Sequence, residues 1–369
     1  MNTTDQPADN NDPGGLHDPA IVAAKHADAH SASLTARVEQ LIDAHIADNP
    51  LYEAARKQGQ EIAAIVKDFG MDEAMLAGTL LYPLVKCGAI SRTQVQKNFG
   101  GELNALVREI VKLSDFGFPQ NWNPDAGLDG RQIDALRKML LAIAEDVRLV
   151  LVRLADQLHR LRRAKSASAD ERRQIALETR EIFAPLASRL GIWQIKWELE
   201  DLAFRFLQPD DYQKIARWLD ERRTDREAYI ADVIAGIEAQ VAAAGITATV
   251  QGRPKHIYSI WRKMQLKGLD FQQVFDVRAV RVLLDSVADC YTVLGIVHGN
   301  WPYLAGEFDD YIATPKENNY QSLHTAVIGP EHKTVEIQIR THEMHQHAEL
   351  GVAAHWSYKE GTAANPSYH

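Results

Sequence analysis

The sequence predicts an α+β protein in which an all-α domain is followed by an α/β domain built around a mixed sheet. Apolar residues recur with helical spacing almost throughout the region from Leu34 to about Phe206. Alternating segments, which have the period of a strand, appear only after that region, at residues 247–252, 277–284, 324–329 and 334–340. Glycines and a Pro/Gly-rich stretch at 117–130 divide the helical part into separate helices.

Length and composition are those of an ordinary globular protein. The 369 residues suffice for two or three domains, with 46% hydrophobic and 25% charged residues. A net charge of −9 argues against a chain that coats nucleic acid non-specifically. Cys87 and Cys290 lie far apart and in no metal-binding spacing, which fits a reducing compartment. We expect a cytoplasmic protein without membrane contacts, because no apolar run is long enough to span a bilayer and no signal peptide opens the chain.

These patterns divide the chain into four segments. Residues 1–32 are largely polar and aperiodic, so we expect a disordered tail. Residues 33–190 form the all-α domain, residues 191–361 the second domain, and residues 362–369 a polar tail. The clearest helix is expected at Val147–Leu161, where one stripe is apolar. That stripe consists of Val147, Val150, Leu151, Leu154, Leu158 and Leu161.

A basic helix is expected directly after the first strand. Gly252 ends the strand, and Pro254 fits the first position of a helix, where its missing N–H costs nothing. The buried stripe of this helix would be Ile257, Ile260, Trp261 and Met264. Lys255, Ser259 and Lys263, spaced by four, would line another face. A helix N-terminus preceded by Arg253 is a natural phosphate site, although a solvated basic face is the simpler alternative for an isolated helix.

Two carboxylates suggest a metal site in the second domain. In the last strand Val335, Ile337 and Ile339 alternate with Glu336, Gln338 and Arg340, so one face is apolar and the other polar. Asp276 stands where the strand at 277–284 begins, either just before it or at a bulge. Two carboxylates on neighbouring strands repel each other unless a cation neutralises them, and hard oxygen ligands beside phosphates suit Mg²⁺. The alternative is that the polar face of the last strand is simply exposed.

Five segments in this order resemble the RelA/SpoT-homologue family of alarmone enzymes. The segments are Gly252–Met264, Phe275–Arg281, Lys316–His324, Val335–Thr341 and Gly351–Trp356. The likeness extends from about Leu34 to Gly361 and is greatest to the RelA-type, synthetase-only branch. It implies a helical HD-type domain followed by a nucleotidyltransferase-like synthetase domain. It also implies transfer of pyrophosphate from ATP to the 3′-hydroxyl of GDP or GTP, which yields (p)ppGpp.

The resemblance also assigns roles by position. Arg253 and Arg281 would sandwich the adenine, and Lys255, Ser259 and Lys263 would hold the ATP phosphates. Asp276 and Glu336 would bind Mg²⁺, with Glu336 also taking the hydroxyl proton. Tyr320 would stack on guanine, with Lys316, Asn318, His324 and Gln338 around the acceptor. These residue types suit phosphoryl transfer, which depends on positioning and charge neutralisation.

Two details refine the likeness. Asn319 stands where the family usually has glycine, and asparagine tolerates the positive φ that such a turn requires. The segment 307–310 carries Glu307, Asp309 and Asp310 where bifunctional members have a basic version. By resemblance this acidic motif accompanies a preference for GDP over GTP, which brings more negative charge.

The helical domain stands where the family has a hydrolase that needs a His/Asp cluster for Mn²⁺. The expected pairs of metal ligands are replaced here by Gln58 with Gly59, Tyr82 with Pro83, and Lys86 with Cys87. Of the expected ligands only Asp156 remains. One carboxylate cannot hold a transition metal, and Lys86 would repel it. We therefore expect a pseudo-hydrolase without metal, in which Asp156 is a capping or ion-paired helix residue.

Partners and alternatives also follow from the resemblance. Long family members continue into regulatory domains that engage ribosomes and uncharged tRNA, so this chain would correspond to their N-terminal catalytic half. The alternative to an active synthetase is an autoinhibited, nucleotide-binding regulatory fragment; a retained hydrolase is disfavoured. The histidine-rich segment 341–355, with His342, Glu343, His345 and His347, fits a helix on the sheet better than a metal site.

Overall fold

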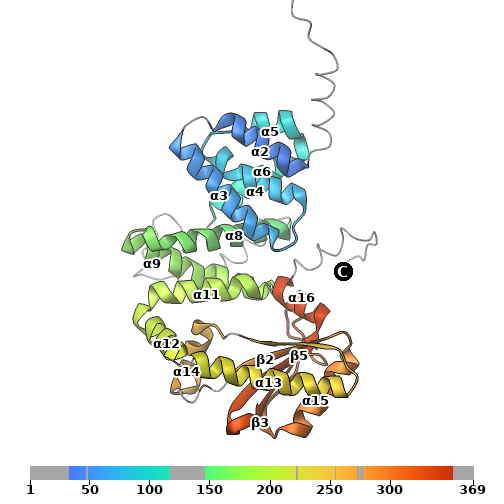
Figure 1. The fold of residues 1–369 in the computed structure, drawn as a ribbon. Coiled ribbons are helices and arrows are strands. Elements are labelled where there is room, and N and C mark those ends of the chain that lie inside the picture. Colours follow the sequence, from blue (N-terminus) through green and yellow to red (C-terminus); the bar gives the residue numbers. More distant parts are fainter. Residues whose placement is uncertain are drawn as a thin grey trace, which may run out of the picture.

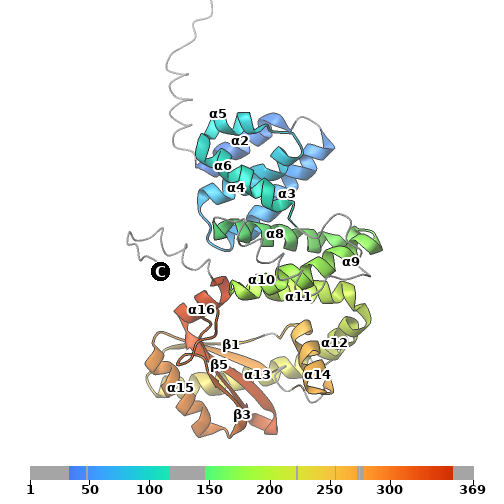
Figure 2. The same ribbon diagram turned by 180° about the vertical axis from the view of Figure 1, so that it is seen from behind.

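The computed structural model describes residues 33–46, 49–116, 146–221, 223–253, 255–271, 274 and 278–351. Several sequence-based expectations concern residues outside these ranges. They include the two tails, the Pro/Gly-rich stretch at 117–130, Pro254, Asp276 and the segment after Gly351. In Figures 1 and 2 the helical part lies at one end, the sheet lies at the other, and a tier of helices runs between them.

The first part of the chain is helical, as predicted. Its helices are α2 (Leu34–His45), α3 (Pro50–Lys67), α4 (Glu73–Lys86), α5 (Arg92–Phe99), α6 (Gly101–Ser114), α8 (Val147–Arg163), α9 (Ala169–Glu178), α10 (Ala184–Arg189) and α11 (Trp193–Leu207), with a π-helical turn at Thr179–Phe183. Polar caps explain where many of them begin. The side chains of Ser33, Asn49, Asp72, Ser91, Asp146 and Ser168 each accept a hydrogen bond from a backbone N–H in the first turn of the helix that follows.

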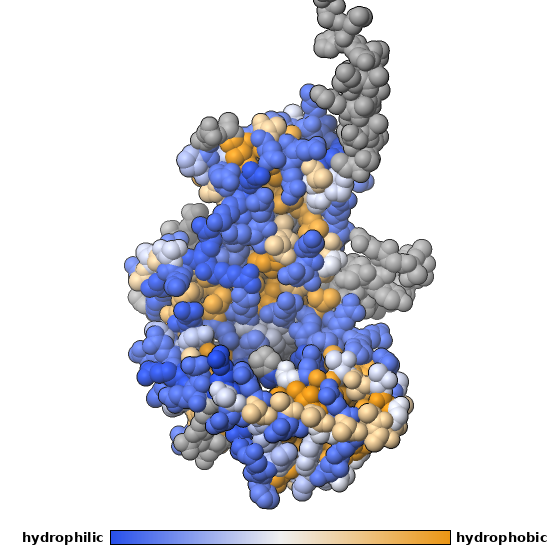
Figure 3. Space-filling view, viewed as in Figure 1, coloured by the Kyte–Doolittle hydropathy of each residue, from blue (hydrophilic) through white to orange (hydrophobic). Residues whose placement is uncertain are grey.

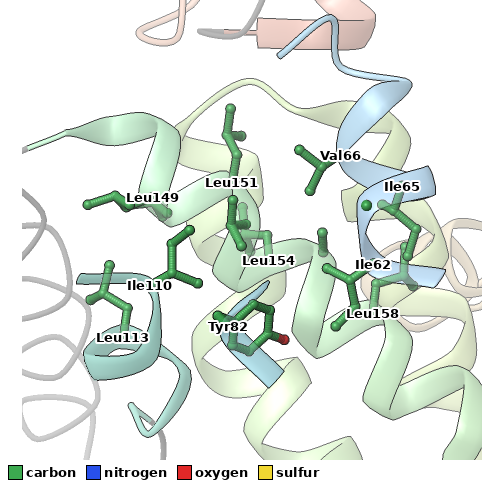
Figure 4. Close-up of a cluster of buried hydrophobic side chains, with 14 of the residues drawn as sticks. Ile62, Ile65, Val66, Tyr82, Ile110, Leu113, Leu149, Leu151, Leu154 and Leu158 are labelled. Carbon is green, nitrogen blue, oxygen red and sulfur yellow. The ribbon is translucent and has the colours of Figure 1, made fainter. Parts of the chain in front are cut away.

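Helix α8 is the centre of the helical core. The expected helix at Val147–Leu161 is confirmed and continues to Arg163. All residues from Leu149 to His159 are buried, so α8 is enclosed on every side rather than along a single stripe. Figure 4 shows apolar side chains of α3, α4 and α6 around it: Ile62, Ile65, Val66, Tyr82, Ile110 and Leu113 meet Leu149, Leu151, Leu154 and Leu158.

The second part contains the predicted mixed sheet. Its elements are α12 (Pro209–Glu221), α13 (Arg223–Ala243), β1 (Ala248–Gly252), α14 (Ile257–Lys267), β2 (Ala279–Leu284), α15 (Val287–Asn300), β3 (Tyr303–Asp310), β4 (Leu323–Ile328), β5 (Thr334–Thr341) and α16 (His342–Leu350). The strand order is β1-β2-β5-β4-β3. Strands β2 and β5 are parallel, and the other neighbours are antiparallel. The sequence did not predict β3, an edge strand with a register shift and little apolar alternation.

One face of the sheet packs on helices and the other carries polar side chains. Val335, Ile337 and Ile339 of β5 share a core with Val233 and Ile237 of α13. Residues of α15 complete this core. The even-numbered residues of β5 therefore lie on the opposite face. Figure 3 shows a largely hydrophilic face, on which apolar residues appear both in the helical part and around the sheet.

Helix α11 connects the two parts. Ile195, Leu199 and Ala203 belong to the helical core, although α11 follows the predicted domain boundary at residue 190. The same helix contacts α14 and α16 of the second part. Among the helices that the structure describes, none combines the length and the apolar character needed to cross a bilayer.

Candidate active site

A row of polar residues crosses the sheet on the face away from α13 and α15. Strand pairing sets Asp309 opposite His324, His324 opposite Gln338, Gln338 beside Arg281, and Arg281 opposite Gln251. Side chains paired across strands share a face. Because side chains alternate along a strand, Glu336 and Arg340 flank Gln338 on this same face. The alternative that this face is simply exposed does not hold for Arg340, which is only 1% exposed.

A cavity of about 120 Å³ lies over this row. It brings together six residues that the sequence singled out: Arg253, Arg281, Lys316, Tyr320, His324 and Gln338. It is completed by Trp193 and Trp197 of α11, by Arg340 of β5, and by Ala348 and Glu349 of α16. Lys255, Ser259 and Lys263 are not among the described residues that line it.

Glu336 is the carboxylate beside this cavity. Its Oε1 accepts a hydrogen bond from Gln338 Nε2 at 2.7 Å. Arg253 Nη1 and His324 Nδ1 both lie 3.8 Å from the same oxygen. The parallel pairing of β2 and β5 fixes Glu336, whose N–H donates to the carbonyl of Arg278 at 2.9 Å. A partly buried carboxylate is thus held among an amide, an imidazole and a guanidinium.

The described residues fit part of a Mg²⁺ site. Mg²⁺ binds through one or two carboxylates together with substrate phosphates, and Glu336 supplies one such carboxylate. Asp276, the second expected ligand, lies outside the described residues. Within the described residues no group of three or more His, Cys, Asp or Glu side chains is arranged around a common metal position.

The loop before β4 has the turn that its asparagine predicted. Asn319 has φ of 59°, and its N–H donates to the carbonyl of Lys316 at 2.8 Å. The Asn318 carboxamide oxygen accepts from Tyr320 N at 3.3 Å. Asparagine is therefore sufficient at residue 319, where the φ lies in the left-handed region.

Tyr320 and His324 form a hydrogen-bonded pair inside the site. The Tyr320 hydroxyl and His324 Nε2 lie 2.8 Å apart. Burial, together with nearby Arg253 and Lys316, lowers the pKa of His324 to about 3, so the imidazole is neutral at physiological pH. The ammonium of Lys316 lies 5.5 Å from the centre of the Tyr320 ring.

The N-terminus of α14 differs from the prediction. The helix begins at Ile257 with His256 as its cap, so Lys255 precedes it and only Ser259 and Lys263 lie on it. Its burial pattern follows the prediction, with Ile260 fully buried. The expected open phosphate site is already taken by a carboxylate, since Asp201 of α11 accepts a hydrogen bond from Tyr258 N at 2.8 Å. The basic sequence gave no sign of this partner, which lies more than fifty residues earlier.

The three acidic residues of the predicted acceptor-preference motif separate in space. Glu307 pairs with Lys267 of α14 at 3.2 Å. Asp310 accepts from the backbone N–H groups of Ile312 and Ala313 and from the hydroxyl of Tyr291. Only Asp309 lies directly opposite His324 in the sheet. Strand pairing thus sets one carboxylate of the motif directly opposite a site residue.

A second cavity, of about 1360 Å³, adjoins the first. It lies between α10, α11, α14 and the loop at 311–318, and both cavities are lined by Trp193 and Lys316. Sequence reasoning missed the contribution of α11 to both. The ammonium of Lys196 lies over the rings of Trp193 and Trp197, at 4.6 and 4.0 Å from their centres. The i, i+3, i+4 spacing of Trp193, Lys196 and Trp197 could have indicated that they share a helix face, but the same spacing occurs in any amphipathic helix.

The residues around Asp156, where the resemblance expected lost hydrolase ligands, form a buried polar cluster. Asp156 accepts from the Tyr82 hydroxyl at 2.9 Å, from Gln58 at 3.5 Å and from Arg153 at 3.2 Å. The expectation that Asp156 is an ion-paired helix residue is confirmed. The ammonium of Lys86, which was expected to repel a metal ion, pairs with Asp115 at 2.6 Å. The buried guanidinium of Arg153, which the sequence analysis did not single out, is the cation at this carboxylate.

Comparisons with known proteins identify both parts of the chain. A family model described as a region found in RelA/SpoT proteins matches residues 252–363, and an HD-domain model matches residues 39–193. A protein from Photobacterium angustum named GTP pyrophosphokinase is 48% identical over 307 residues. This match covers 83% of the chain and 41% of that protein.

Two further similarities were found. A Synechocystis protein named as a probable guanosine-3′,5′-bis(diphosphate) 3′-pyrophosphohydrolase is 44% identical over 300 residues, which are 81% of this chain and 39% of that protein. The crystal structure of small alarmone synthetase 1 from Bacillus subtilis bound to its product pppGpp is similar over 41% of this chain and 84% of that chain, with 26% identity and a TM-score of 0.30. The chain spans about two fifths of the length of the curated relatives that it matches. With both domains matched in order and nearly half of the aligned residues identical, the chain belongs to the RelA/SpoT family.

Proposed function

We propose that this chain transfers the β,γ-pyrophosphate of ATP to the 3′-hydroxyl of GDP or GTP and so makes (p)ppGpp. The observation that carries this proposal is the arrangement around Glu336, which lies with Arg253 and His324 on the face that also holds Tyr320. Such a site offers a carboxylate, fixed cations and an aromatic ring within one small volume. Phosphoryl transfer between nucleotides depends on positioning and charge neutralisation, which these groups can supply.

In the proposed reaction the 3′-oxygen of the acceptor attacks the β-phosphorus of ATP. A new O–P bond forms, the bond from that phosphorus to the α,β-bridging oxygen breaks, and AMP leaves. Glu336 accepts the proton of the hydroxyl group. Its hydrogen bond from Gln338 and its contacts with Arg253 and His324 orient the carboxylate toward the cavity.

The proposed substrate contacts keep the assignments made from the sequence. Arg253 and Arg281 hold the adenine, and Lys255, Ser259 and Lys263 approach the ATP phosphates from the α14 side. Lys316, Asn318, Tyr320, His324 and Gln338 surround the acceptor. Glu336 and Asp276 would hold Mg²⁺, which supplies charge neutralisation for the phosphates when bound.

We also propose that the helical domain does not hydrolyse (p)ppGpp. The Asp156 carboxylate already accepts from Tyr82, Gln58 and Arg153, so its oxygens are committed to protein donors. A transition metal needs several deprotonated ligands, and a buried guanidinium opposes a second cation at the same position. This cluster supports assignment to the synthetase-only branch.

A second candidate is a synthetase held in an inhibited state. The cavity over the site measures about 120 Å³, whereas ligand pockets are typically ~300–1,000 Å³. The helical part contacts the acceptor loop directly: Asn318 Nδ2 donates to the carbonyl of Ser188 at 3.2 Å, and Trp193 meets the edge of Tyr320 at 5.9 Å. Moving α11 away would enlarge the space around Tyr320.

One assay separates these candidates. The chain is incubated with γ-labelled ATP, Mg²⁺ and either GDP or GTP, and the products are resolved by thin-layer chromatography. Label in ppGpp, lost in Glu336→Gln, supports the active synthetase; no label with either acceptor overturns it. No label from the parent chain, but label from Trp193→Ala, supports the inhibited state. A parallel tube with ppGpp and Mn²⁺ tests hydrolysis, and loss of ppGpp would overturn the inactive hydrolase.

A further inference from the structure

Arg340 is a buried cation to which neither the sequence analysis nor the proposed reaction gives a role. It lies on β5 next to the row of site residues and is only 1% exposed. Its guanidinium carbon lies 5.8 Å from the centre of the Tyr320 ring. Burying a charged group is costly unless partners compensate, so this position requires an explanation.

Helix α16 supplies the partners of Arg340. Thr341 caps α16, so the helix starts directly after β5 and runs back alongside the site. Two residues one turn apart, His345 and Glu349, then reach Arg340. Arg340 Nη2 lies 2.6 Å from His345 Nδ1 and 3.3 Å from Glu349 Oε1. Burial and the neighbouring arginines lower the pKa of His345 to about 4, so its neutral ring accepts the hydrogen bond.

The pairing of Arg340 is incomplete on the side of the cavity. Glu349 is shared, because Arg281 Nη1 lies 3.4 Å from the same carboxylate oxygen. The Nε atoms of Arg281 and Arg340 are both buried and have no hydrogen-bond partner among the residues that the structure describes. Both side chains line the cavity with Arg253 and Lys316, so cations outnumber the carboxylates of Glu336 and Glu349 there. A purely structural arginine would have its donors satisfied within the fold.

We propose that Arg340 is a positioning residue for the acceptor base, which it serves by fixing the ring of Tyr320, while His345 and Glu349 of α16 hold the guanidinium in place. This inference rests on the proposed function, in which Tyr320 stacks on guanine. A guanidinium against the ring restricts its tilt and polarises it. The stacking surface is then preformed when the nucleotide arrives, and less ordering is required on binding.

The proposal is tested with Arg340→Lys and Arg340→Gln, each in the parent chain and in a Tyr320→Ala background. Steady-state kinetics give the KM for the acceptor and for ATP, and isothermal titration calorimetry gives the Kd for GDP without turnover. We expect Arg340→Gln to raise the acceptor KM and the GDP Kd about three- to thirtyfold, the range of a cation–π contact, and Arg340→Lys, which keeps a cation, to raise them less. The ATP KM should change less than about twofold. In the Tyr320→Ala background the same substitution should add almost nothing, because Arg340 acts through the ring.

Glu349→Gln should reproduce part of the effect, whereas Glu343→Gln, an exposed position on the same helix, should not. The role of Arg340 would be overturned by any of three results. The substitution could change the acceptor KM equally with and without Tyr320, change the KM of both substrates equally, or leave the acceptor KM unchanged. Because Arg340 is buried, thermal unfolding is measured for every variant. Arg340→Lys retains the positive charge, so it still tests the proposal if Arg340→Gln does not fold. A parent chain that binds GDP but transfers nothing would overturn the proposed function and leave the GDP-binding comparison interpretable.

Discussion

The carboxylate of Asp201 in α11 accepts a hydrogen bond from the backbone N–H of Tyr258 in the first turn of α14, at 2.8 Å. Its second oxygen lies 3.3 Å from Nδ1 of His256. The His256 ring in turn stacks on Trp197, with ring centres 5.2 Å apart. Asp201 of α11 thus occupies the positive N-terminal end of α14, the helix that is proposed to face the ATP phosphates.

Replacing Asp201 with asparagine should tighten ATP binding. The amide retains an oxygen for Tyr258 N but loses the negative charge, which repels the triphosphate at the same helix end. A charge at a helix terminus contributes ~0.3–1 kcal/mol, so we expect the ATP KM to fall about two- to fivefold, with the acceptor KM unchanged. Initial rates at varied ATP measure this effect. Asp210→Asn, at the start of α12, is the control, and an unchanged ATP KM in Asp201→Asn would show that Asp201 is only a structural cap.

Glu336→Gln should remove synthesis while leaving the fold intact. The amide oxygen can still accept from Gln338, so the free energy of unfolding should change by less than ~1 kcal/mol. Loss of the proton acceptor should lower kcat by ~10²–10⁴-fold. Product formation is measured by chromatography, and chemical denaturation reports stability. A rate near that of the parent chain would remove Glu336 from the proposed mechanism.

The sequence predicted those parts of the fold and site that depend on local pattern. The alternation around Glu336 and the turn at Asn319 were recognised because backbone geometry fixes them within a few residues. Asp201 and Trp193 were missed, because each acts on a partner distant in the sequence. Arg153 was missed although its partner Asp156 lies only three residues later on the same helix. The spacing of apolar residues shows which face of a helix is buried. It does not show whether a charged residue on that face pairs with a residue elsewhere in the structure. The start of α14 was misplaced for a similar reason, since its cap is completed from α11.

Acid should destabilise the protein partly through His324. The pKa of His324 is lowered to about 3 in the fold, chiefly by burial, and an unfolded histidine titrates near ~6.5. Below pH ~6.5 the unfolded chain therefore binds more protons, and stability falls as pH decreases toward 3. His324→Gln should show a shallower fall of Tm between about pH 6.5 and 4. His345, whose pKa is lowered to about 4, adds to the same loss, so the fall should shrink but not vanish. His342→Gln, at an exposed position, should follow the parent curve.

Removing Arg153 should destabilise the helical part strongly. Its guanidinium is buried against Asp156 and the ring of Phe183, and it donates to the carbonyl of Phe116. Arg153→Met would leave the Asp156 carboxylate without its cation, which costs ~3–5 kcal/mol. Urea unfolding measures the change. Arg162→Met, on the same helix at an exposed ion pair with Glu198, should cost less than ~1 kcal/mol. Similar losses in both variants would contradict a structural role specific to Arg153.

The same cluster predicts how the chain responds to manganese. Asp156 is committed to Tyr82 and Arg153, and the described residues of the helical part offer no other group of metal ligands. Mn²⁺ should therefore leave the Tm of this part unchanged, since only a bound ligand stabilises the fold. Added ppGpp should also remain intact in the presence of Mn²⁺. Calorimetric scans with and without Mn²⁺ test the first point, and product analysis tests the second. A manganese-dependent rise in Tm would place a metal site within the domain.

The acidic motif should divide into one residue that affects acceptor choice and one that affects stability. Asp309 lies opposite His324 on the face of the site, where its charge opposes the additional phosphate of GTP. Asp309→Asn should lower the ratio of kcat/KM for GDP over GTP by about two- to fivefold, as expected for a charge interaction of ~0.5–1 kcal/mol. Asp310 instead accepts two backbone hydrogen bonds that close the turn after β3 and a third from the Tyr291 hydroxyl of α15. Asp310→Asn should lower the free energy of unfolding by ~1–2 kcal/mol and leave the acceptor ratio unchanged. Competition assays with both acceptors measure the ratio, and the opposite pattern would place Asp310 rather than Asp309 beside the acceptor phosphates.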